Sequence, residues 1–284
     1  MIKEFARAKI NLSLDLLGKR DDGFHEIETI MQSLELADEV EISEIESGIK
    51  LQVDSAENIP VDEKNLAWKA AVAVSKYCGE NFNVAINLTK KIPSAAGLAG
   101  GSSDAAAVIR GMNKLFNLKL TAEKLCKIGE EVGSDVPFCV VGGTCLSAGR
   151  GEILTKLPDF KKYFVVLVKL RGEISTAWAF KTFDEIPAEK IIHPQTREII
   201  KFFNGGEYEK AFAKCGNVFE EVATKKFPAI KKYKEKMLEA GARFALMSGS
   251  GPTVFALAKD ENTAEKIASK VEGQGAKIFI TKIF

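Results

Sequence analysis

The stretch PSAAGLAGGSSDAAA, residues 93–107, combines small residues with hydroxyl groups in a way that suits anion binding. Its glycines let backbone amides approach a bulky ligand, and its alanine-rich end is typical of a helix. Amides at a helix start are unsatisfied and lie at the positive end of the helix dipole, so they attract phosphate. Ser102 and Ser103 could cap the helix or bond a phosphate oxygen. The stretch is neither a Walker A loop nor a G-x-G-x-x-G motif. Taken alone, it fits a phosphate-binding loop and an ordinary capped turn equally well.

Three other polar residues are placed where they could do chemistry. Lys9 and Asn11 lie two residues apart in ARAKINLSL, so on a strand they would share one face at a spacing of about 7 Å. Asp135, in GSDVPF, lies between a helix end and an apolar run. Taken alone, the strand favours an edge with a solvated polar face, and the aspartate favours a helix cap or a turn. The glycines of residues 248–252 likewise fit a hairpin turn.

Hydrophobic periodicity predicts the elements that would position these residues. Apolar residues alternate with polar ones over residues 5–18, which predicts a strand. Residues 37–46 and 48–54 are expected to form a hairpin. A helix is expected over residues 62–79, opened by an acidic first turn and closed by Gly79. The remaining predictions are strands at 82–93, 163–170, 276–284 and, as a pair around a glycine turn, 243–258, with helices at 102–116, 121–132, 195–203, 207–223, 230–240 and 263–275.

The order of these elements favours an α+β fold over a doubly wound sheet, because strands and helices are mixed without strict alternation. The polar stretch over residues 150–162 favours a division into two domains, residues 1–155 and 156–284.

The composition argues against several classes of function. The 284 residues carry a formal net charge of +1, which favours neither nucleic acid nor an anionic membrane as a partner. The five cysteines form no C-x-x-C pair, and with only two histidines a zinc site is not expected. Reduced thiols in a cytosol are the simplest interpretation. The first residues have no long apolar core, so a signal peptide is not expected, and no apolar run approaches the roughly 18 residues of a membrane span. We therefore expect a cytoplasmic protein.

Five blocks occur in one order along the chain: ARAKINLSL, KRDDGFHEIETIMQSLELAD, PSAAGLAGGSSDAAA, GSDVPFCVVGGTCLSAGRGE and SGSGPTVFA. The third block resembles the signature of the GHMP kinases, the family of galactokinase, homoserine kinase and mevalonate kinase. The block containing DDGFH resembles one subfamily, and the resemblance runs nearly end to end. It implies a ribosomal-protein-S5-like first half and a ferredoxin-like second half with the active site between them. It also implies a kinase of a bacterial cytosol that uses ATP and Mg²⁺ to phosphorylate the 2-hydroxyl of a cytidine diphosphate-linked methylerythritol in non-mevalonate isoprenoid biosynthesis. We expect this kinase to be a monomer or weak dimer.

The resemblance assigns roles to individual residues. It implies that Lys9 and Asp135 are the catalytic pair. The implied ATP-binding residues are the loop Pro93, Ser94, Ala95, Ala96, Gly97, Leu98, Ala99, Gly100, Gly101, Ser102 and Ser103, together with Asn65 near the adenine and Lys90 before the loop. The implied substrate-binding residues are Asn11, Phe24, His25 and Phe180, with one aromatic ring on each side of the cytosine. Phe24 replaces the tyrosine that is common at this position, which keeps stacking and removes a phenolic hydrogen bond.

Some alternatives stay open at this point. Trp178 and Phe183 are neighbouring candidates for the ring assigned to Phe180. Asp104 replaces a common asparagine, and its carboxylate would repel phosphates unless Mg²⁺ or a lysine intervenes; it could instead favour the first turn of the helix. The ligands of Mg²⁺ are not indicated by the sequence. Two other functions remain, a homoserine- or mevalonate-type GHMP kinase and a catalytically silent binding protein of the same fold.

Overall fold

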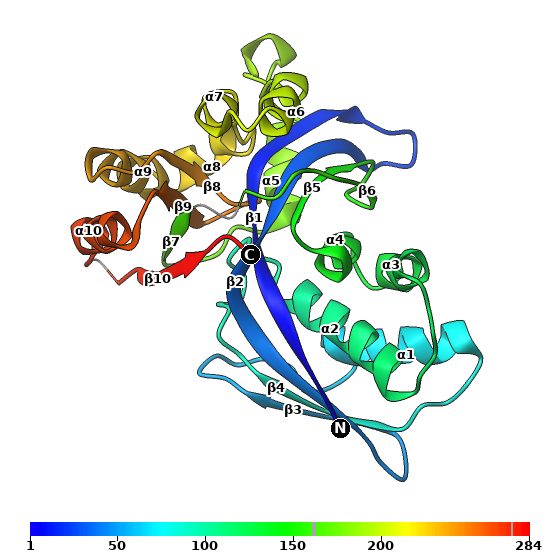
Figure 1. Cartoon of the computed structure of the whole chain (residues 1–284). Helices are drawn as coiled ribbons and strands as arrows, with labels where there is room; N and C mark the ends of the chain where they lie inside the picture. The colour runs from blue at the N-terminus through cyan, green and yellow to red at the C-terminus, as the bar shows by residue number, and fades with distance from the viewer. Residues whose placement is uncertain (161–162, 274) are drawn as a thin grey trace. The chain divides into compact units, whose positions relative to one another are not determined.

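The computed structural model describes residues 1–160, 163–273 and 275–284 (Figure 1), and it confirms the α+β prediction. The chain forms two compact units. Unit 1 consists of Met1–Lys9, Leu36–Ser94 and Ala99–Gly142; unit 2 consists of Ile10–Glu35, Ala95–Leu98 and Gly143–Phe284. Each unit is discontinuous because two long paired strands, β1 (Ile2–Lys19) and β2 (His25–Glu44), contribute to both. A domain boundary between residues 155 and 156 stays a prediction, and two residues of the predicted boundary region, 161 and 162, lie outside the described residues.

The sheet of unit 1 is arranged around β4 (Val84–Thr89). This strand pairs antiparallel with Glu39–Glu44 of β2 and parallel with β3 (Ile49–Asp54). The predicted hairpin of residues 37–46 and 48–54 is therefore wrong, because β4 lies between the two strands. A parallel pair needs a long connection, which α1 (Leu66–Cys78) helps to supply.

The two ends of α1 show how local sequence sets its length. Gly79 adopts a left-handed conformation and ends the helix, as predicted. The predicted acidic start is wrong, because the helix begins at Leu66. The side-chain oxygen of Asn65 accepts a hydrogen bond from the backbone amide of Ala67 and caps the helix.

The helices of unit 1 cover one side of its sheet (Figure 1). They are α1, α2 (Gly100–Leu115), α3 (Ala122–Glu130) and α4 (Val136–Val141); α2 and α3 match predictions, whereas α4 was not predicted. The core contains β-branched and leucine side chains from the sheet and small side chains from α1 and α2, among them Ala67, Ala70, Ala71, Ala105, Ala106 and Ala107. Small residues let these helices pack closely.

Unit 2 contains a four-stranded antiparallel sheet in the order β10-β7-β9-β8. The strands are β7 (Phe164–Lys169), β8 (Phe244–Met247), β9 (Thr253–Ala258) and β10 (Lys277–Lys282), and all four match predictions. A second part of unit 2 pairs β5 (Thr144–Ala148) with residues 29–32 of β2 and with β6 (Ile153–Lys156); neither β5 nor β6 was predicted.

The predictions cover most helices of unit 2, but they omit the helix over Thr176–Phe183 and the 3₁₀ turn over Ala188–Lys190. The helices are α5 (Thr176–Phe183), the 3₁₀ turn η1 (Ala188–Lys190), α6 (Thr196–Asn204), α7 (Tyr208–Phe212), α8 (Glu220–Lys226), α9 (Ala229–Glu239) and α10 (Glu261–Val271). Residue 274, within the predicted helix 263–275, lies outside the described residues. The predicted single helix over 207–223 is wrong. Between α7 and α8 the chain pairs with β1 at Asn217, where the amide of Leu14 donates to the carbonyl of Gly216 and the amide of Val218 donates to the carbonyl of Leu14.

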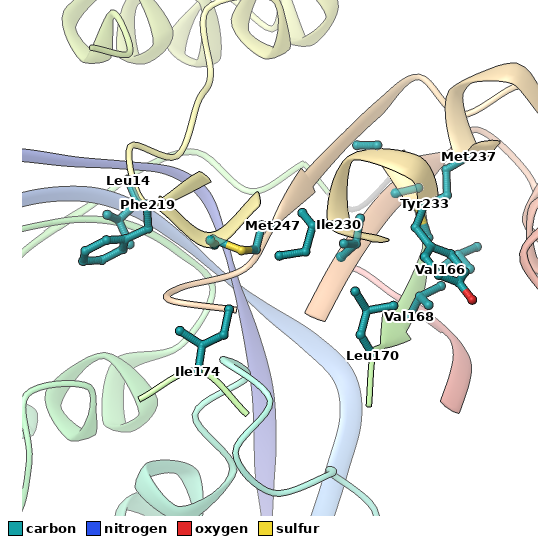
Figure 2. Packing of buried hydrophobic residues seen from close by; sticks show 14 of the residues in the cluster. Leu14, Val166, Val168, Leu170, Ile174, Phe219, Ile230, Tyr233, Met237 and Met247 are labelled. Carbon is teal, nitrogen blue, oxygen red and sulfur yellow. The ribbon is translucent and has the colours of Figure 1, made fainter. Parts of the chain in front are cut away.

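The core of unit 2 joins β1 to the four-stranded sheet and its helices (Figure 2). Leu14 of β1 belongs to the same buried cluster as Phe219, Met247, Val166 and Ile230. This cluster anchors β1 through Leu14 and Leu16, which alternate with its polar residues. Among the described residues, none of the helices combines the length and the apolar character that crossing a bilayer requires.

Candidate active site

The polar side of β1 is buried rather than solvated. Lys9, Asn11, Ser13 and Asp15 all belong to the buried part of the protein, so the prediction of a solvated edge face is wrong. Buried charged and polar groups are costly unless they are paired or hydrogen-bonded. The partners of these residues therefore indicate which site the strand helps to form.

Lys9 and Asp135 form an ion pair within unit 1. The Nζ atom of Lys9 lies 3.5 Å from Oδ2 of Asp135; the lysine side chain is 5% exposed and the aspartate side chain is 37% exposed. Asp135 occupies the N-cap position of α4, but its side chain makes no capping hydrogen bond. The N-cap position fixes the backbone of Asp135. Its carboxylate is directed to the Lys9 ammonium group and is partly open to solvent.

The first turn of α2 is fastened next to this pair. The Ser103 hydroxyl donates to the carbonyl oxygen of Arg7 over 2.5 Å and lies 3.3 Å from Sγ of Cys139. Arg7 precedes Lys9 by two residues, and Cys139 follows Asp135 by four. Ser103 does not cap α2; the N-cap residue is Ala99, in a left-handed conformation. Unit 1 thus brings Lys9, Asp135 and the start of α2 together.

Cys139 is not an ionised nucleophile in this site. Burial and the nearby Asp135 carboxylate raise the pKa of its thiol to about 12. The thiol is therefore protonated at neutral pH.

The loop before α2 has an unusual backbone. Ala95, Gly97 and Ala99 all have positive φ angles, of 48°, 73° and 55°. Such angles in residues other than glycine are uncommon and occur often at functional sites. Within unit 2, a carbon atom added to Gly97 would overlap the carbonyl oxygen of Ser248, whose hydroxyl donates to the carbonyl of Gly97 over 2.9 Å. The glycine block at 248–252 is the hairpin turn between β8 and β9, and it also holds the loop.

Asn217 supports this turn and was missed by sequence reasoning. Its side-chain amide donates to the carbonyl oxygens of Met247 and Gly249, each over 2.8 Å, and its side-chain oxygen accepts from the amide of Phe219 over 3.0 Å. A single asparagine in CGNVFEE belongs to no motif that we recognised, and the segment was predicted to be helical, so no local signal indicated this role.

His25 and Phe180 lie together within unit 2. Their ring centroids are 4.8 Å apart, with an angle of 31° between the planes. Nε2 of His25 lies 2.6 Å from Oδ1 of Asp184, a residue that the sequence did not indicate. Burial opposes ionisation of Asp184, but the hydrogen bond with His25 and the charge of Lys19 outweigh it and lower its pKa. The ionised carboxylate fixes the orientation of the imidazole ring.

The neighbouring aromatic residues differ in their surroundings. Phe24 is 54% exposed, and the guanidinium group of Arg150 lies 5.2 Å from its ring centroid. Phe183 is buried in the core of unit 2. Trp178 has a different neighbour, because the ammonium group of Lys226 lies 4.2 Å from its ring centroid. Of the three candidate rings in α5, Phe180 is the one beside His25.

The remaining predicted residues have identifiable structural partners. The Asn11 side-chain amide donates to the Thr29 hydroxyl over 2.9 Å. The side chain of Asn65 is engaged on both sides, because it caps α1 and donates to the carbonyl of Pro60 over 2.7 Å. The amide and hydroxyl of Ser94, next to the buried Pro93, both donate to Glu57.

Lys90 neutralises the carboxylate of Asp104, whose role the sequence left open. Its ammonium group is paired with both Asp104 and Asp38 inside unit 1, so a lysine does intervene at the aspartate that replaces the common asparagine. Among the described residues, no group of three or more histidine, cysteine, aspartate or glutamate side chains is arranged to hold a metal ion.

Comparison with known proteins identifies the family. Residues 65–143 match the N-terminal domain of the GHMP kinases, and residues 206–277 match their C-terminal domain. The chain therefore belongs to the GHMP kinase family, as its sequence motifs implied, and it has the α+β fold of that family.

Within this family the similarity is more specific. The chain is 43% identical to a Listeria monocytogenes protein named 4-diphosphocytidyl-2-C-methyl-D-erythritol kinase, over 98% of this chain and 94% of the relative. A Bacillus pumilus protein of the same name is 42% identical, over 99% and 96%. A crystal structure of 4-(cytidine 5'-diphospho)-2C-methyl-D-erythritol kinase superposes with a TM-score of 0.84 at 29% identity and covers 99% of both chains. Homoserine kinase from Cytophaga hutchinsonii, at 20% identity and a TM-score of 0.78 over 99% of this chain and 94% of its own, shares the fold.

Proposed function

We propose that this protein transfers the γ-phosphoryl group of ATP to the 2-hydroxyl of 4-diphosphocytidyl-2-C-methyl-D-erythritol, a step of the non-mevalonate route to isoprenoid precursors. The names of the relatives support the substrate. The observation that carries the chemistry is the buried Lys9 ammonium 3.5 Å from the partly exposed Asp135 carboxylate. A silent binding protein would not need to keep this charged pair at the start of the loop helix.

Positioning and charge stabilisation dominate phosphoryl transfer, because its transition state is loose. We assign to Asp135 the orientation of the acceptor hydroxyl and the late acceptance of its proton. A carboxylate is a far weaker base than an alkoxide, so orientation matters as much as proton removal. We assign to Lys9 the stabilisation of developing negative charge on the transferring group and the placement of Asp135.

For ATP we propose the loop of residues 93–103, whose amides at the start of α2 suit a triphosphate. Asn65 and Lys90 are placed with this loop by sequence resemblance. Mg²⁺ would neutralise the triphosphate when bound. Among the described residues there is no dedicated cluster of metal ligands, which is consistent with a cation bound mainly by phosphate oxygens.

For the cytosine base we propose the surface formed by Phe180, His25 and the exposed ring of Phe24. A base stacked on an aromatic face gains about 1–3 kcal/mol. Because Nε2 of His25 is engaged by Asp184, its Nδ1 is left to meet the base edge. Asn11 completes the proposed substrate residues from β1.

The reaction is tested by ADP release with a panel of acceptors. The proposal predicts ATP-dependent turnover with 4-diphosphocytidyl-2-C-methyl-D-erythritol and none above background with homoserine or mevalonate. The matched control is Lys9→Met, which should lose turnover. Turnover restricted to homoserine or mevalonate would establish another kind of GHMP kinase. ATP binding without turnover on any acceptor would establish a binding protein.

We further propose that the protein acts in a bacterial cytosol as a monomer or weak dimer without nucleic acid or membrane partners. The relatives come from bacteria, the co-substrate is ATP, and the net charge of +1 provides no field for polyanions. Sedimentation of the purified chain measures the oligomeric state.

A further inference from the structure

A buried network of three charged residues lies at the base of the glycine loop. The Lys90 ammonium group is paired with carboxylate oxygens of Asp38 and Asp104, and all three residues belong to unit 1. The exposed fractions of the three side chains are 6% for Lys90, none for Asp38 and 4% for Asp104. Lys90 follows β4, Asp38 lies in β2 and Asp104 lies in α2, so the network joins three elements.

The network holds the chain on both sides of the loop. Oδ1 of Asp38 accepts from the backbone amides of Lys91 and Ile92, the residues that lead into the loop. Oδ2 of Asp38 accepts from Lys90, which in turn donates to Asp104 in the helix that leaves the loop. Asp38 thus binds the entry of the loop directly, through backbone amides, and binds the exit of the loop through Lys90 and Asp104.

The packing around Gly100 leaves little room between loop and network. A carbon atom added to Gly100 would lie 3.1 Å from Cγ2 of Ile92 and 3.6 Å from Nζ of Lys90. The first residue of α2 therefore rests on the network. A change in the network would be passed directly to the amides that start the helix.

The charge of the network is compatible with a nearby polyanion. Two carboxylates and one ammonium group would leave a net negative charge, but burial raises the pKa of Asp104 to about 7 against the opposing charge of Lys90. Oδ1 of Asp104 has no hydrogen-bond partner among the described residues. A proton held on Asp104 would make the network nearly neutral.

We infer that Asp38, Lys90 and Asp104 are positioning residues that clamp the two ends of the glycine loop in its nucleotide-binding conformation. Lys90 acts on the nucleotide through the loop and does not touch it. This inference rests on the proposed function only in taking ATP as the ligand of the loop.

A double-mutant cycle of ATP binding tests the clamp. We compare Asp104→Ala, Lys90→Met and the double variant by calorimetry, without an acceptor alcohol. The clamp predicts that each single change weakens ATP binding on the order of tenfold, since each breaks the charge-assisted link between Lys90 and Asp104. Lys90→Met also breaks the pair with Asp38, so the double variant should be no worse than Lys90→Met alone. Asp104→Asn, which keeps an acceptor for Lys90, should restore binding to within about threefold of the wild type. The matched control is Lys91→Met, which removes an exposed ammonium group one residue away and should leave binding unchanged.

The opposite pattern would overturn the inference. If Lys90 contacts the nucleotide directly, Lys90→Met alone weakens binding, and Asp104→Ala leaves it unchanged or tightens it by removing a carboxylate. Hydrogen exchange of residues 91–103 without nucleotide provides a second measurement that does not depend on ATP or on the acceptor. The clamp predicts faster exchange there in Asp104→Ala than in Asp104→Asn, with α1 unaffected. Equal exchange in the two variants would contradict it even if Lys90→Met fails to fold.

Discussion

Gly97→Ala is the substitution that should disturb the loop most selectively. Gly97 has a φ of 73°, and an added methyl group would overlap the carbonyl oxygen of Ser248 and lie 3.4 Å from the carbonyl oxygen of Gly251. The overlapping atom belongs to the backbone of the hairpin turn between β8 and β9, so no change of side-chain rotamer can relieve the contact.

The expected cost has two parts. A left-handed conformation costs an alanine about 1–2 kcal/mol. Forcing a methyl group into a closely packed place costs about 1–3 kcal/mol more. If the total of about 2–5 kcal/mol acts on the binding-competent loop, ATP affinity should fall by at least about thirtyfold, because 1.4 kcal/mol corresponds to a factor of ten.

Calorimetric titration of the variant with ATP measures this loss. Ala99→Gly is the matched control, because its native φ of 55° suits glycine and the substitution removes a methyl group from the same loop. We expect the control to bind ATP within about threefold of the wild type. Wild-type affinity in Gly97→Ala would refute the reasoning, since the loop would then bind ATP in another conformation.

Three further predictions concern separate parts of the protein. In steady-state kinetics, Phe180→Ala should raise KM for the cytidine substrate by roughly 5- to 150-fold, because a stacking surface is lost, and should leave KM for ATP unchanged. The control Trp178→Ala should leave KM for the cytidine substrate unchanged. Asn217→Ala should lower the melting temperature by several degrees, because it leaves two carbonyl groups without donors at about 1–3 kcal/mol; an unchanged melting temperature in calorimetry would contradict this. The raised pKa of Asp104 means that the folded chain keeps a proton that the unfolded chain releases, so the free energy of unfolding should fall by at most about 4 kcal/mol as pH rises from about 4 to about 7. Asp104→Asn should remove this component of the fall in denaturant titrations at a series of pH values.

Elements with clean local patterns could be predicted from the sequence. The pair β8 and β9 has apolar runs around a glycine turn, and α10 has helical periodicity. Neither prediction depends on residues far away in the sequence. The hairpin predicted for residues 37–54 failed because strand pairing is decided by which strands meet in the sheet, and β4 lies 30 residues beyond β3. The helix predicted over 207–223 failed because β1 competes for the backbone groups of residues 216–218.

The candidate site was predictable only where a family motif carried it. Lys9, Asp135 and the loop were indicated by resemblance, and unit 1 places Lys9, Asp135 and the start of α2 together. The supporting residues were not predictable. Asp184 meets His25 from 159 residues away, and Asp38 meets Lys90 from 52 residues away, so neither pair leaves a local pattern. An aspartate or asparagine outside a motif looks like a surface residue until the fold is known.

Asp135→Asn separates a Lys9–Asp135 pair that performs the transfer from one that only binds the substrate. Binding of 4-diphosphocytidyl-2-C-methyl-D-erythritol is measured by calorimetry, and phosphoryl transfer is measured under single-turnover conditions with excess enzyme. We expect substrate affinity to stay within about threefold of the wild type while transfer slows by about 10²- to 10⁴-fold, the usual contribution of a positioned acid–base group. Near-normal transfer in this variant would show that the Asp135 carboxylate does not take part in the transfer.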